Sequence, residues 1–370
     1  MKIKICYLIS SLCNEGPVNV VYNIIKYINF NKFDVSIITF IPEKENTRFE
    51  EFKRFPIKIY QLSADKQYNL FKLYGLLKKQ LTIISPDILH AHCPRSLYLM
   101  HFLSGTYKKV YTIHIFPGKQ QLNLYGHIKG RIIIALNHFF TQKVDLAIGC
   151  AESVAEQYKK EKGWNIKAIP NGSSLPVWER NKEERSELRK EFGLKDNIKY
   201  FIFIGRFSKE KNPDILYNVF SRLKDKNIGL IMLGQGPMWK LIHNENSSNI
   251  IMPGFTTRVY DYLKASDYYI SASDVEGLAN TLLESMSVGL PCALSNIPSH
   301  REVLSKAEKN IGFIFDQKDI NSIENTIYKL MTLDYMSTSS YIQSLFENNY
   351  TAKIMSEKYQ SEYEKVLKKI

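Results

Sequence analysis

The run EGLANTLLESMSVGLP, residues Glu276 to Pro291, decides how this chain is expected to fold. It follows a strand-like segment at 267–272, and Ser273 and Asp274 are residues that favour a turn. From about Ala279 the apolar residues recur at three- and four-residue spacing, which predicts a helix. At the start of the chain, a strand at residues 2–10, a turn that contains Gly16 and a helix that begins with Pro17 follow in the order typical of a doubly wound α/β domain, which binds ligands beyond the carboxyl ends of its strands.

The start of the predicted helix is a candidate anion site. Main-chain N–H groups there lack partners within the helix and lie at the positive end of its dipole, which suits a phosphate. Glu284 lies one turn inside, and helical side chains lean toward the N-terminus, so its carboxylate can accept hydrogen bonds from hydroxyls beside that phosphate. Two carboxylates around an anion site fit a nucleotide-sugar better than a nucleoside triphosphate. The alternative is a strand, turn and helix with solvated glutamates. The candidate donor-binding residues here are Glu276, Gly277, Leu278, Ala279, Asn280, Thr281 and Glu284.

Glu276 and Glu284, with seven residues between them in the form Glu-Gly…Leu-Leu-Glu…Gly-Leu-Pro, resemble the signature of the retaining glycosyltransferases called family 4. The resemblance implies the GT-B fold, an α/β architecture with two Rossmann-like domains facing across a cleft. It also implies a C-terminal helix that crosses back to the N-terminal lobe. We therefore expect an acceptor-binding domain at residues 1–172, joined by a helix at 353–370, and a donor-binding domain at 178–352.

Other parts of the chain agree with an α/β fold. Strand-like runs alternate with helical stretches, which predicts parallel sheets. In the first half these runs are residues 2–10, 34–40, 57–62, 87–92, 110–114, 144–149 and 167–170.

A second segment supplies positive charge. Residues 205–211 follow a predicted strand and resemble the family's Gly-Arg…Lys-Asn loop, beginning at Gly205. A nucleoside diphosphate leaving group needs its growing charge neutralised, and many glycosyltransferases use a metal held by Asp-x-Asp for this. The chain contains no Asp-x-Asp. Arg206 and Lys211 are the natural substitutes, so we expect neither a metal nor a cofactor; a surface Arg/Lys loop is the alternative.

Three further segments are candidate donor contacts. In family 4 the first turn of the chain carries two glycines, whereas here Glu15 takes the first position and only Gly16 remains. Gly254 and Phe255 end another strand-like run, and the resemblance implies that their main-chain groups lie near the base. Residues 297–302 are expected to form a loop that borders the donor.

Two strand ends in the first half carry histidines. His90 and His92 point to one face of their strand, but no third ligand is apparent, so a metal site is the less favoured interpretation. We expect His92 and Arg95 to contact the acceptor, with Arg95 holding a phosphate through two hydrogen bonds. His114 ends a run that resembles the family's Thr-x-His, which implies a position beside the donor sugar. The alternative is a packing histidine.

The positive charge is unevenly distributed. The net charge is +13, and residues 1–175 carry 24 Lys and Arg against 12 Asp and Glu. This excess indicates an anionic partner. Nucleic acid is not favoured, because no recognised binding motif accompanies the basic residues. Aromatic residues mixed with lysines between Tyr68 and Lys79 favour an anionic membrane surface, and a solvated basic surface is the alternative.

These observations predict a cytoplasmic enzyme, peripheral at the inner face of the cell membrane. No apolar run approaches the ~18 residues needed to span a bilayer, and five cysteines without a Cys-x-x-Cys pair indicate reduced thiols.

As the resemblance implies, the enzyme is a retaining hexosyl- or N-acetylhexosaminyltransferase that uses His114, Glu276, Arg206 and Lys211. Its expected donor is a nucleotide-diphosphate sugar, with UDP favoured over GDP. The expected acceptor is a polyprenyl-diphosphate-linked saccharide in O-antigen, capsule or exopolysaccharide synthesis. A nucleotide-sugar epimerase and a non-catalytic sugar- or membrane-binding scaffold are the alternatives.

Overall fold

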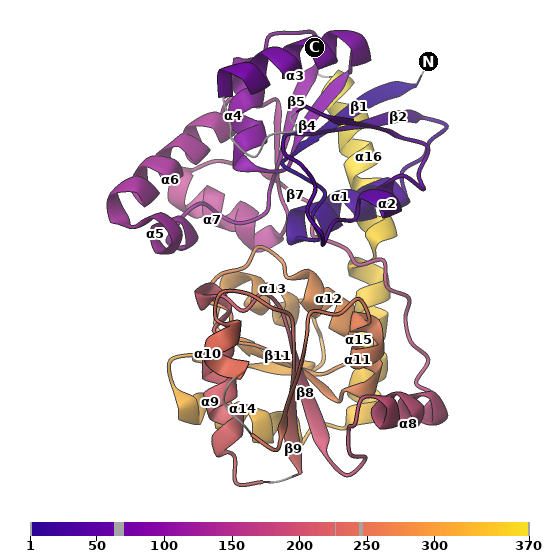
Figure 1. The fold of residues 1–370 in the computed structure, drawn as a ribbon, viewed down its shortest axis with the longest axis vertical. Coiled ribbons are helices and arrows are strands. Elements are labelled where there is room, and N and C mark those ends of the chain that lie inside the picture. The colour runs from indigo at the N-terminus through magenta and orange to yellow at the C-terminus, as the bar shows by residue number, and fades with distance from the viewer. Residues whose placement is uncertain (1, 63–69, 226, 244–246, 369–370) are drawn as a thin grey trace. The chain divides into compact units, whose positions relative to one another are not determined.

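The computed structural model describes residues 2–62, 70–225, 227–243 and 247–368, which divide into two compact units (Figure 1). Unit 1 comprises Met1–Gly172 and Ala352–Ile370, and unit 2 comprises Ser173–Thr351. Each unit is a parallel sheet with helices between consecutive strands. As the resemblance implies, the last helix, α16 (Ala352–Lys368), is part of the N-terminal unit.

Unit 1 contains a seven-stranded sheet in the order β3-β2-β1-β4-β5-β6-β7, with all neighbours parallel. The strand order reverses between β1 and β4, and ligands of such sheets bind at this point. The strands are β1 (Ile3–Ile9), β2 (Phe33–Thr39), β3 (Lys58–Gln61), β4 (Ile88–Ala91), β5 (Lys108–Ile113), β6 (Leu146–Gly149) and β7 (Lys167–Ala168). The helices before α16 are α1 (Gly16–Lys26), α2 (Phe49–Phe52), α3 (Leu70–Ile84), α4 (Pro94–Phe102), α5 (Lys119–Tyr125), α6 (His127–Thr141) and α7 (Glu152–Lys162).

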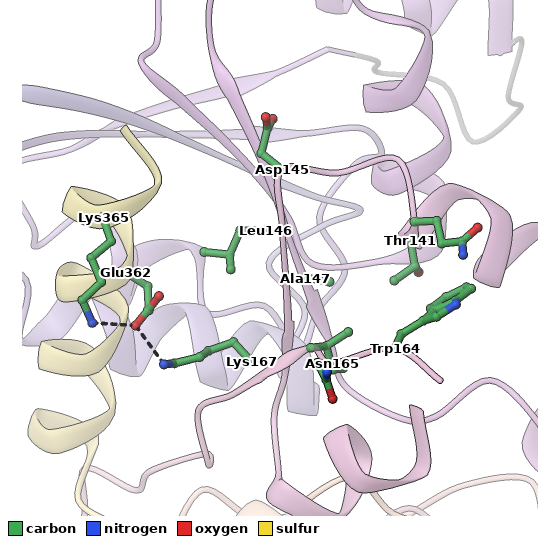
Figure 2. Close-up of a pocket in the computed structure, with 11 residues that line it drawn as sticks. Thr141, Asp145, Leu146, Ala147, Trp164, Asn165, Lys167, Glu362 and Lys365 are labelled. Atoms are coloured by element: carbon green, nitrogen blue, oxygen red, sulfur yellow. Dashed lines mark hydrogen bonds and ion pairs between the residues drawn. The ribbon is translucent and has the colours of Figure 1, made fainter. Parts of the chain in front are cut away.

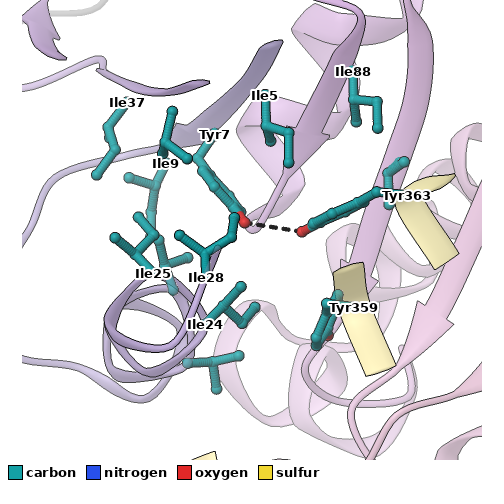
Figure 3. Packing of buried hydrophobic residues seen from close by; sticks show 14 of the residues in the cluster. Ile5, Tyr7, Ile9, Ile24, Ile25, Ile28, Ile37, Ile88, Tyr359 and Tyr363 are labelled. Atoms are coloured by element: carbon teal, nitrogen blue, oxygen red, sulfur yellow. Dashed lines mark hydrogen bonds between the residues drawn. The ribbon is translucent and has the colours of Figure 1, made fainter. Parts of the chain in front are cut away.

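The core of unit 1 joins the first strand to the last helix. Strand β1 is apolar on both faces because helices cover both, and α1 contributes a buried stripe that includes Ile24 and Ile25. Tyr359 and Tyr363 of α16 complete this core, and the hydroxyls of Tyr7 and Tyr363 lie 3.0 Å apart (Figure 3). The crossing helix is therefore a structural part of the first domain.

Unit 2 contains a six-stranded parallel sheet in the order β10-β9-β8-β11-β12-β13. Its strands are β8 (Lys199–Ile204), β9 (Ile228–Leu233), β10 (Ile250–Gly254), β11 (Tyr268–Ser271), β12 (Cys292–Ser295) and β13 (Gly312–Phe315). Its helices are α8 (Lys182–Glu191), the 3₁₀ turn η1 (Lys209–Lys211), α9 (Pro213–Arg222), α10 (Trp239–His243), α11 (Val259–Ala265), α12 (Asn280–Ser287), α13 (Pro298–Ser305), α14 (Ile320–Leu330) and α15 (Tyr335–Asn349).

One element differs from the sequence prediction. Residues 297–302 were expected to form a loop, but most of them lie in helix α13, so that prediction was wrong. Ile297 is extended and Pro298 occupies the first turn of the helix, where its missing N–H costs nothing. Of the aromatic and basic residues predicted to face a membrane, Tyr68 lies outside the described residues.

Candidate active-site residues

In unit 2 the predicted donor residues come from two neighbouring strands. Strands β8 and β11 pair in parallel, so the loops that follow them leave the same edge of the sheet. Lys211 in the first loop forms an ion pair with Glu276 in the second. The loops are also joined by Asn212 Nδ2, which donates to the main-chain oxygen of Ala272 at 2.9 Å. The fold therefore brings together two residues that are 65 positions apart in the sequence.

Glu276 remains ionised although it is nearly buried. Its side chain is 11% exposed, and the Ser273 hydroxyl donates to Oε1 at 2.9 Å. Burial disfavours the charged carboxylate, but the charge and hydrogen bond of Lys211 more than offset this and lower the pKa of Glu276 below its usual value. The site thus holds a fixed negative and a fixed positive group together at neutral pH.

The helix after Glu276 begins close to Ala279, where the sequence predicts it. Ala279 is the N-cap of α12, and its own side chain makes no capping hydrogen bond. Leu278 and Ala279 are buried, while Asn280, Thr281 and Glu284 are half-buried. The Thr281 hydroxyl lies 2.9 Å from the Tyr269 hydroxyl, which fixes the first turn to strand β11. Phosphate binding here, and ribose binding by Glu284, remain predictions.

Glycines let three turns pack closely at this edge of the sheet. Gly234 has φ +126°, and a Cβ added there would lie 1.9 Å from the main-chain oxygen of Gly205. The Gly234 N–H donates to the oxygen of Gly254 at 2.9 Å. The predicted base-binding pair therefore lies beside the β8 turn, with Phe255 48% exposed and Arg206 also exposed.

A histidine that the sequence placed in a loop is instead buried in the same cluster. His300 of α13 is fully buried, and its Nδ1 lies 3.0 Å from the Ser295 oxygen. Its Nε2 has no hydrogen-bond partner among the described residues. Burial lowers the pKa of His300 to about 4, although the charge of Glu276 acts in the opposite direction. The sequence holds a signal for this burial. Pro298 marks a helix start, and His300 and the apolar Val303 are three residues apart on one face of that helix.

Unit 1 carries a chain of buried polar groups. His90 and His92 do share one face, with ring centroids 4.1 Å apart. His90 Nδ1 lies 2.8 Å from the Tyr363 hydroxyl, and His90 Nε2 lies 2.9 Å from the Thr112 hydroxyl. His92 continues the chain, since its Nδ1 is 3.2 Å from His114 Nε2. These contacts run from the last helix to the histidine predicted to lie beside the donor sugar.

His90, His92 and His114 are all neutral at pH 7. Burial lowers the pKa of His114 to about 3. Burial and neighbouring histidines hold the pKa values of His90 and His92 well below the usual range. Rings packed this closely cannot all carry a positive charge, because like charges at this distance repel strongly. His114 can therefore accept or donate one hydrogen bond, but it does not act as a cation.

The remaining predicted residues of unit 1 lie near the first turns. His92 is 1% exposed and contacts His114, which supports an orienting role; acceptor contact remains a prediction. Arg95 is half-buried, with Nη1 3.3 Å from the Ser10 hydroxyl. Gly16 is exposed, and an added Cβ would meet nothing within 4 Å. The fold itself does not require glycine at that position.

Two further features are distinct from these clusters. A pocket of about 540 Å³ lies in unit 1 at the amino ends of β6 and β7, where Glu362 pairs with Lys167 and Lys365 (Figure 2). None of the predicted site residues lines it, and it lies at the sheet edge opposite to the one that binds ligands in such folds.

Within the described ranges, no group of three or more His, Cys, Asp or Glu is placed to hold a metal ion. In the same ranges, no helix is long and apolar enough to cross a membrane.

The sequence matches two family models. Residues 184–344 match "Glycosyl transferases group 1", and residues 15–175 match "Glycosyltransferase Family 4". The chain is 26% identical over 281 residues to an Escherichia coli UDP-Gal:alpha-D-GlcNAc-diphosphoundecaprenol alpha-1,3-galactosyltransferase, covering 71% of this chain and 70% of the relative. It is 24% identical to the E. coli O-antigen biosynthesis glycosyltransferase WclY, covering 99% of both chains.

Solved structures show the same architecture. Anabaena HepE, crystallised in complex with UDP and glucose, superposes with a TM-score of 0.78 at 17% identity, covering 98% of this chain and 99% of that one. Two parallel-sheet units with these neighbours define the GT-B class, as the sequence predicted. The chain belongs to the group 1, family 4 glycosyltransferases, and the resemblance stated from the sequence is confirmed.

Proposed function

We propose that this glycosyltransferase moves a sugar from a nucleotide-diphosphate sugar to a lipid-linked saccharide, with retention of the anomeric configuration and without a metal. The observation that carries the proposal is the paired Lys211 and Glu276 beside the first turn of α12, whose N-cap residue Ala279 makes no side-chain capping bond, at the carboxyl ends of β8 and β11. A cation and a helix N-terminus at one place suit a diphosphate. The absence of Asp-x-Asp from the sequence agrees with this use of fixed positive groups.

In the proposed reaction, the bond between the anomeric carbon and the diphosphate oxygen breaks, and the acceptor oxygen bonds to that carbon from the same face. The acceptor proton passes to the departing phosphate oxygen. Lys211, Arg206 and the first turn of α12 stabilise the charge that grows on this phosphate. Glu276 is engaged by Lys211 and Ser273, so we assign it to binding the sugar or diphosphate and not to nucleophilic attack. Neutral His114 bonds a sugar hydroxyl or orients the leaving group.

The relatives favour one class of substrate. The E. coli galactosyltransferase is named for a UDP-sugar donor and a diphosphoundecaprenol-linked acceptor, and other relatives are named for O-antigen and capsular polysaccharide synthesis. We infer a UDP-sugar donor, a polyprenyl-diphosphate-linked acceptor and a role in surface-polysaccharide assembly. Such an acceptor is anchored in a membrane, so we place the enzyme in the cytoplasm, peripheral to the inner leaflet.

The donor is tested first by thermal stability. A true donor stabilises the folded state in proportion to its affinity, so melting should be followed with UDP, GDP and a panel of their sugars. We expect UDP-sugars to raise Tm, and Glu284→Ala to abolish the shift with little change in the Tm of the unliganded protein. A scaffold that does not bind a donor would give no shift.

The reaction is tested with the stabilising donor and a polyprenyl-diphosphate-linked saccharide. We expect an α-linked product, with activity that survives EDTA. An inverted product refutes the retaining mechanism, and a strict requirement for manganese refutes the role of the fixed cations. An isomerised sugar formed from donor alone identifies an epimerase instead.

A further inference from the structure

Helix α6 of unit 1 exposes large apolar side chains along one side. Ile128, Ile132, Leu136 and Phe139 are 79%, 56%, 39% and 50% exposed. They are three or four residues apart, so they form one stripe on the helix. Helix α6 packs on its neighbours through its other side, and a Cβ added at Gly130 would lie 2.8 Å from a main-chain oxygen of α5.

Neighbouring helices extend this stripe. Phe102 of α4 is 64% exposed, and Leu124 of α5 is 59% exposed. The ring of His101 lies 5.1 Å from that of Phe102 and 6.0 Å from that of Phe139, so both phenylalanines pack around the same histidine. Helices α4, α5 and α6 lie together on one side of unit 1 (Figure 1). We call Phe102, Leu124, Ile128, Ile132, Leu136 and Phe139 the α6 face.

The surroundings of the α6 face are strongly basic. Between Asp87 and Asp145 the sequence has seven Lys or Arg and no Asp or Glu. Lys129 and Arg131 of α6 are exposed, and Lys143 Nζ lies 5.7 Å from the ring centre of Phe139. An apolar stripe flanked by cations is the composition of helices that lie in a membrane interface. The general positive charge of the N-terminal half does not by itself predict where such contact would occur.

We infer that the α6 face docks on an anionic lipid bilayer, with its apolar side chains entering the boundary between headgroups and acyl chains and its cations meeting lipid phosphates. A second copy of the chain is a poorer occupant, because a two-fold contact would bring two basic surfaces together without acidic partners. Nucleic acid would satisfy the cations but leave the isoleucines in water. The inference rests on the proposed function only in that a lipid-linked acceptor makes such docking useful.

The test measures binding of the full chain to vesicles of phosphatidylcholine, with and without phosphatidylglycerol, over a range of salt. We expect wild-type protein to bind anionic vesicles and to keep part of its binding at high salt, because apolar insertion is not screened. The double variant Ile128→Asn/Ile132→Asn should bind at least ~10-fold more weakly and lose the salt-resistant part. Lys129→Gln/Arg131→Gln should weaken binding mainly at low salt.

The matched control is Ile83→Asn. Ile83 is 73% exposed in the same unit but lies at the C-terminal end of α3, away from Tyr74, whose hydroxyl contacts the Phe102 oxygen. We expect its vesicle binding and Tm to equal those of the wild type. The double α6 variant should also keep its Tm, because the replaced side chains are exposed.

Several results would overturn the inference. Vesicle binding of the double variant equal to wild type excludes the α6 face, as does equal loss of binding in the Ile83 control. A wild-type dimer in sedimentation that the double variant abolishes identifies a second copy as the occupant. Vesicle binding is separable from catalysis: a chain that docks but transfers no sugar refutes the proposed function alone. If an α6 variant binds vesicles as the wild type does and still transfers sugar, the docking inference is refuted and the proposed function stands.

Discussion

The two units bury polar groups in opposite ways. In unit 2, Lys211 and Glu276 keep full charges because each supplies the other's partner, and Ser273 satisfies a further lone pair of Glu276. In unit 1, His92 and His114 are as deeply placed, but the ring partners found among the described residues are other neutral imidazoles: His92 lies 3.2 Å from His114 and 3.4 Å from His90. A buried charge survives only when it is paired, whereas an unpaired imidazole loses its proton.

This contrast assigns different tasks to the two units. A fixed cation that faces a leaving group stabilises charge without reorganising, which is the requirement at the donor side. Neutral imidazoles can orient hydroxyl groups of the substrates, and because they carry no charge they do not compete with Lys211 and Arg206 for the negatively charged diphosphate of the donor.

The largest effect should be on stability in mild acid. His90, His92 and His114 have folded pKa values below the ordinary 6.5, so the unfolded state binds their protons first. Their contribution to stability is complete above pH 6.5 and is lost as the pH falls below it, by up to ~1.4 kcal/mol per pH unit for each histidine. Unit 2 has Glu276, whose pKa is lowered from 4.5, so its contribution is lost only below about pH 4.5.

Hydrogen exchange followed by mass spectrometry reads the two units separately. Between pH 7 and 5 we expect protection factors in the β1, β4 and β5 segments to fall more than those in β8 and β11. The difference in protection between the two units is reduced by His300 of unit 2. Burial lowers the pKa of His300 to about 4, so unit 2 also loses some stability over this pH range. Equal losses in both units would contradict the assignment of a neutral histidine chain to unit 1.

Removing the fixed cation should have the next largest effect. Lys211→Ala leaves Glu276 buried without its partner and removes positive charge from the leaving group, so turnover should fall by ~10²-fold or more. Arg206→Ala, at an exposed position of the same loop, should have a similar effect on turnover without that burial penalty. The measurement is kcat with saturating donor and acceptor.

Lys209→Ala is the control for both variants. Lys209 is exposed and lies in the same 3₁₀ turn as Lys211, so it changes the net charge of the loop equally without touching Glu276. We expect its kcat to equal that of the wild type. Full turnover in Arg206→Ala would remove Arg206 from the mechanism.

The close turns of unit 2 should respond to a single methyl group. Gly234→Ala combines a φ of +126° with a clash against the Gly205 oxygen, and should lower the free energy of unfolding by more than ~2 kcal/mol. Gly163→Ala in unit 1 has φ +71° and no atom within 4 Å, so it carries only the backbone strain of ~1 kcal/mol. Urea unfolding of both variants measures the difference. Equal losses would show that the turns of unit 2 can move apart.

Local sequence patterns predicted most of the fold. The alternation of strands and helices, and the turn before Ala279, are set by residues within a few positions of each other. The segment at 297–302 was misjudged because a short helix of mixed polar residues has little periodicity, so only Pro298 marks its start. The helix gains its stability from burying Val303 and His300, which depends on tertiary packing.

The sequence motifs predict which residues belong to the site, and that membership stays a prediction, but the motifs do not predict the contacts among those residues. Glu276, Lys211 and Arg206 were chosen by the motifs in which they occur, yet their spacing in the sequence does not indicate that Lys211 pairs directly with Glu276. The histidine chain was missed for the same reason. His92 and His114 end neighbouring strands, but only the parallel register of β4 and β5 brings their rings together.

The smallest effect, a modest loss of kcat, should come from replacing His92, which orients His114. His92→Phe keeps a ring of similar size in the core but removes the hydrogen bond to His114, so His114 loses its fixed orientation. We expect kcat to fall by about 10-fold, because a small misplacement near the reacting carbon is costly, while the KM for donor stays within about 2-fold. His92→Gln, whose amide can restore a hydrogen bond, should recover part of kcat. A purely structural role would lower the Tm of both variants and leave kcat per folded molecule unchanged.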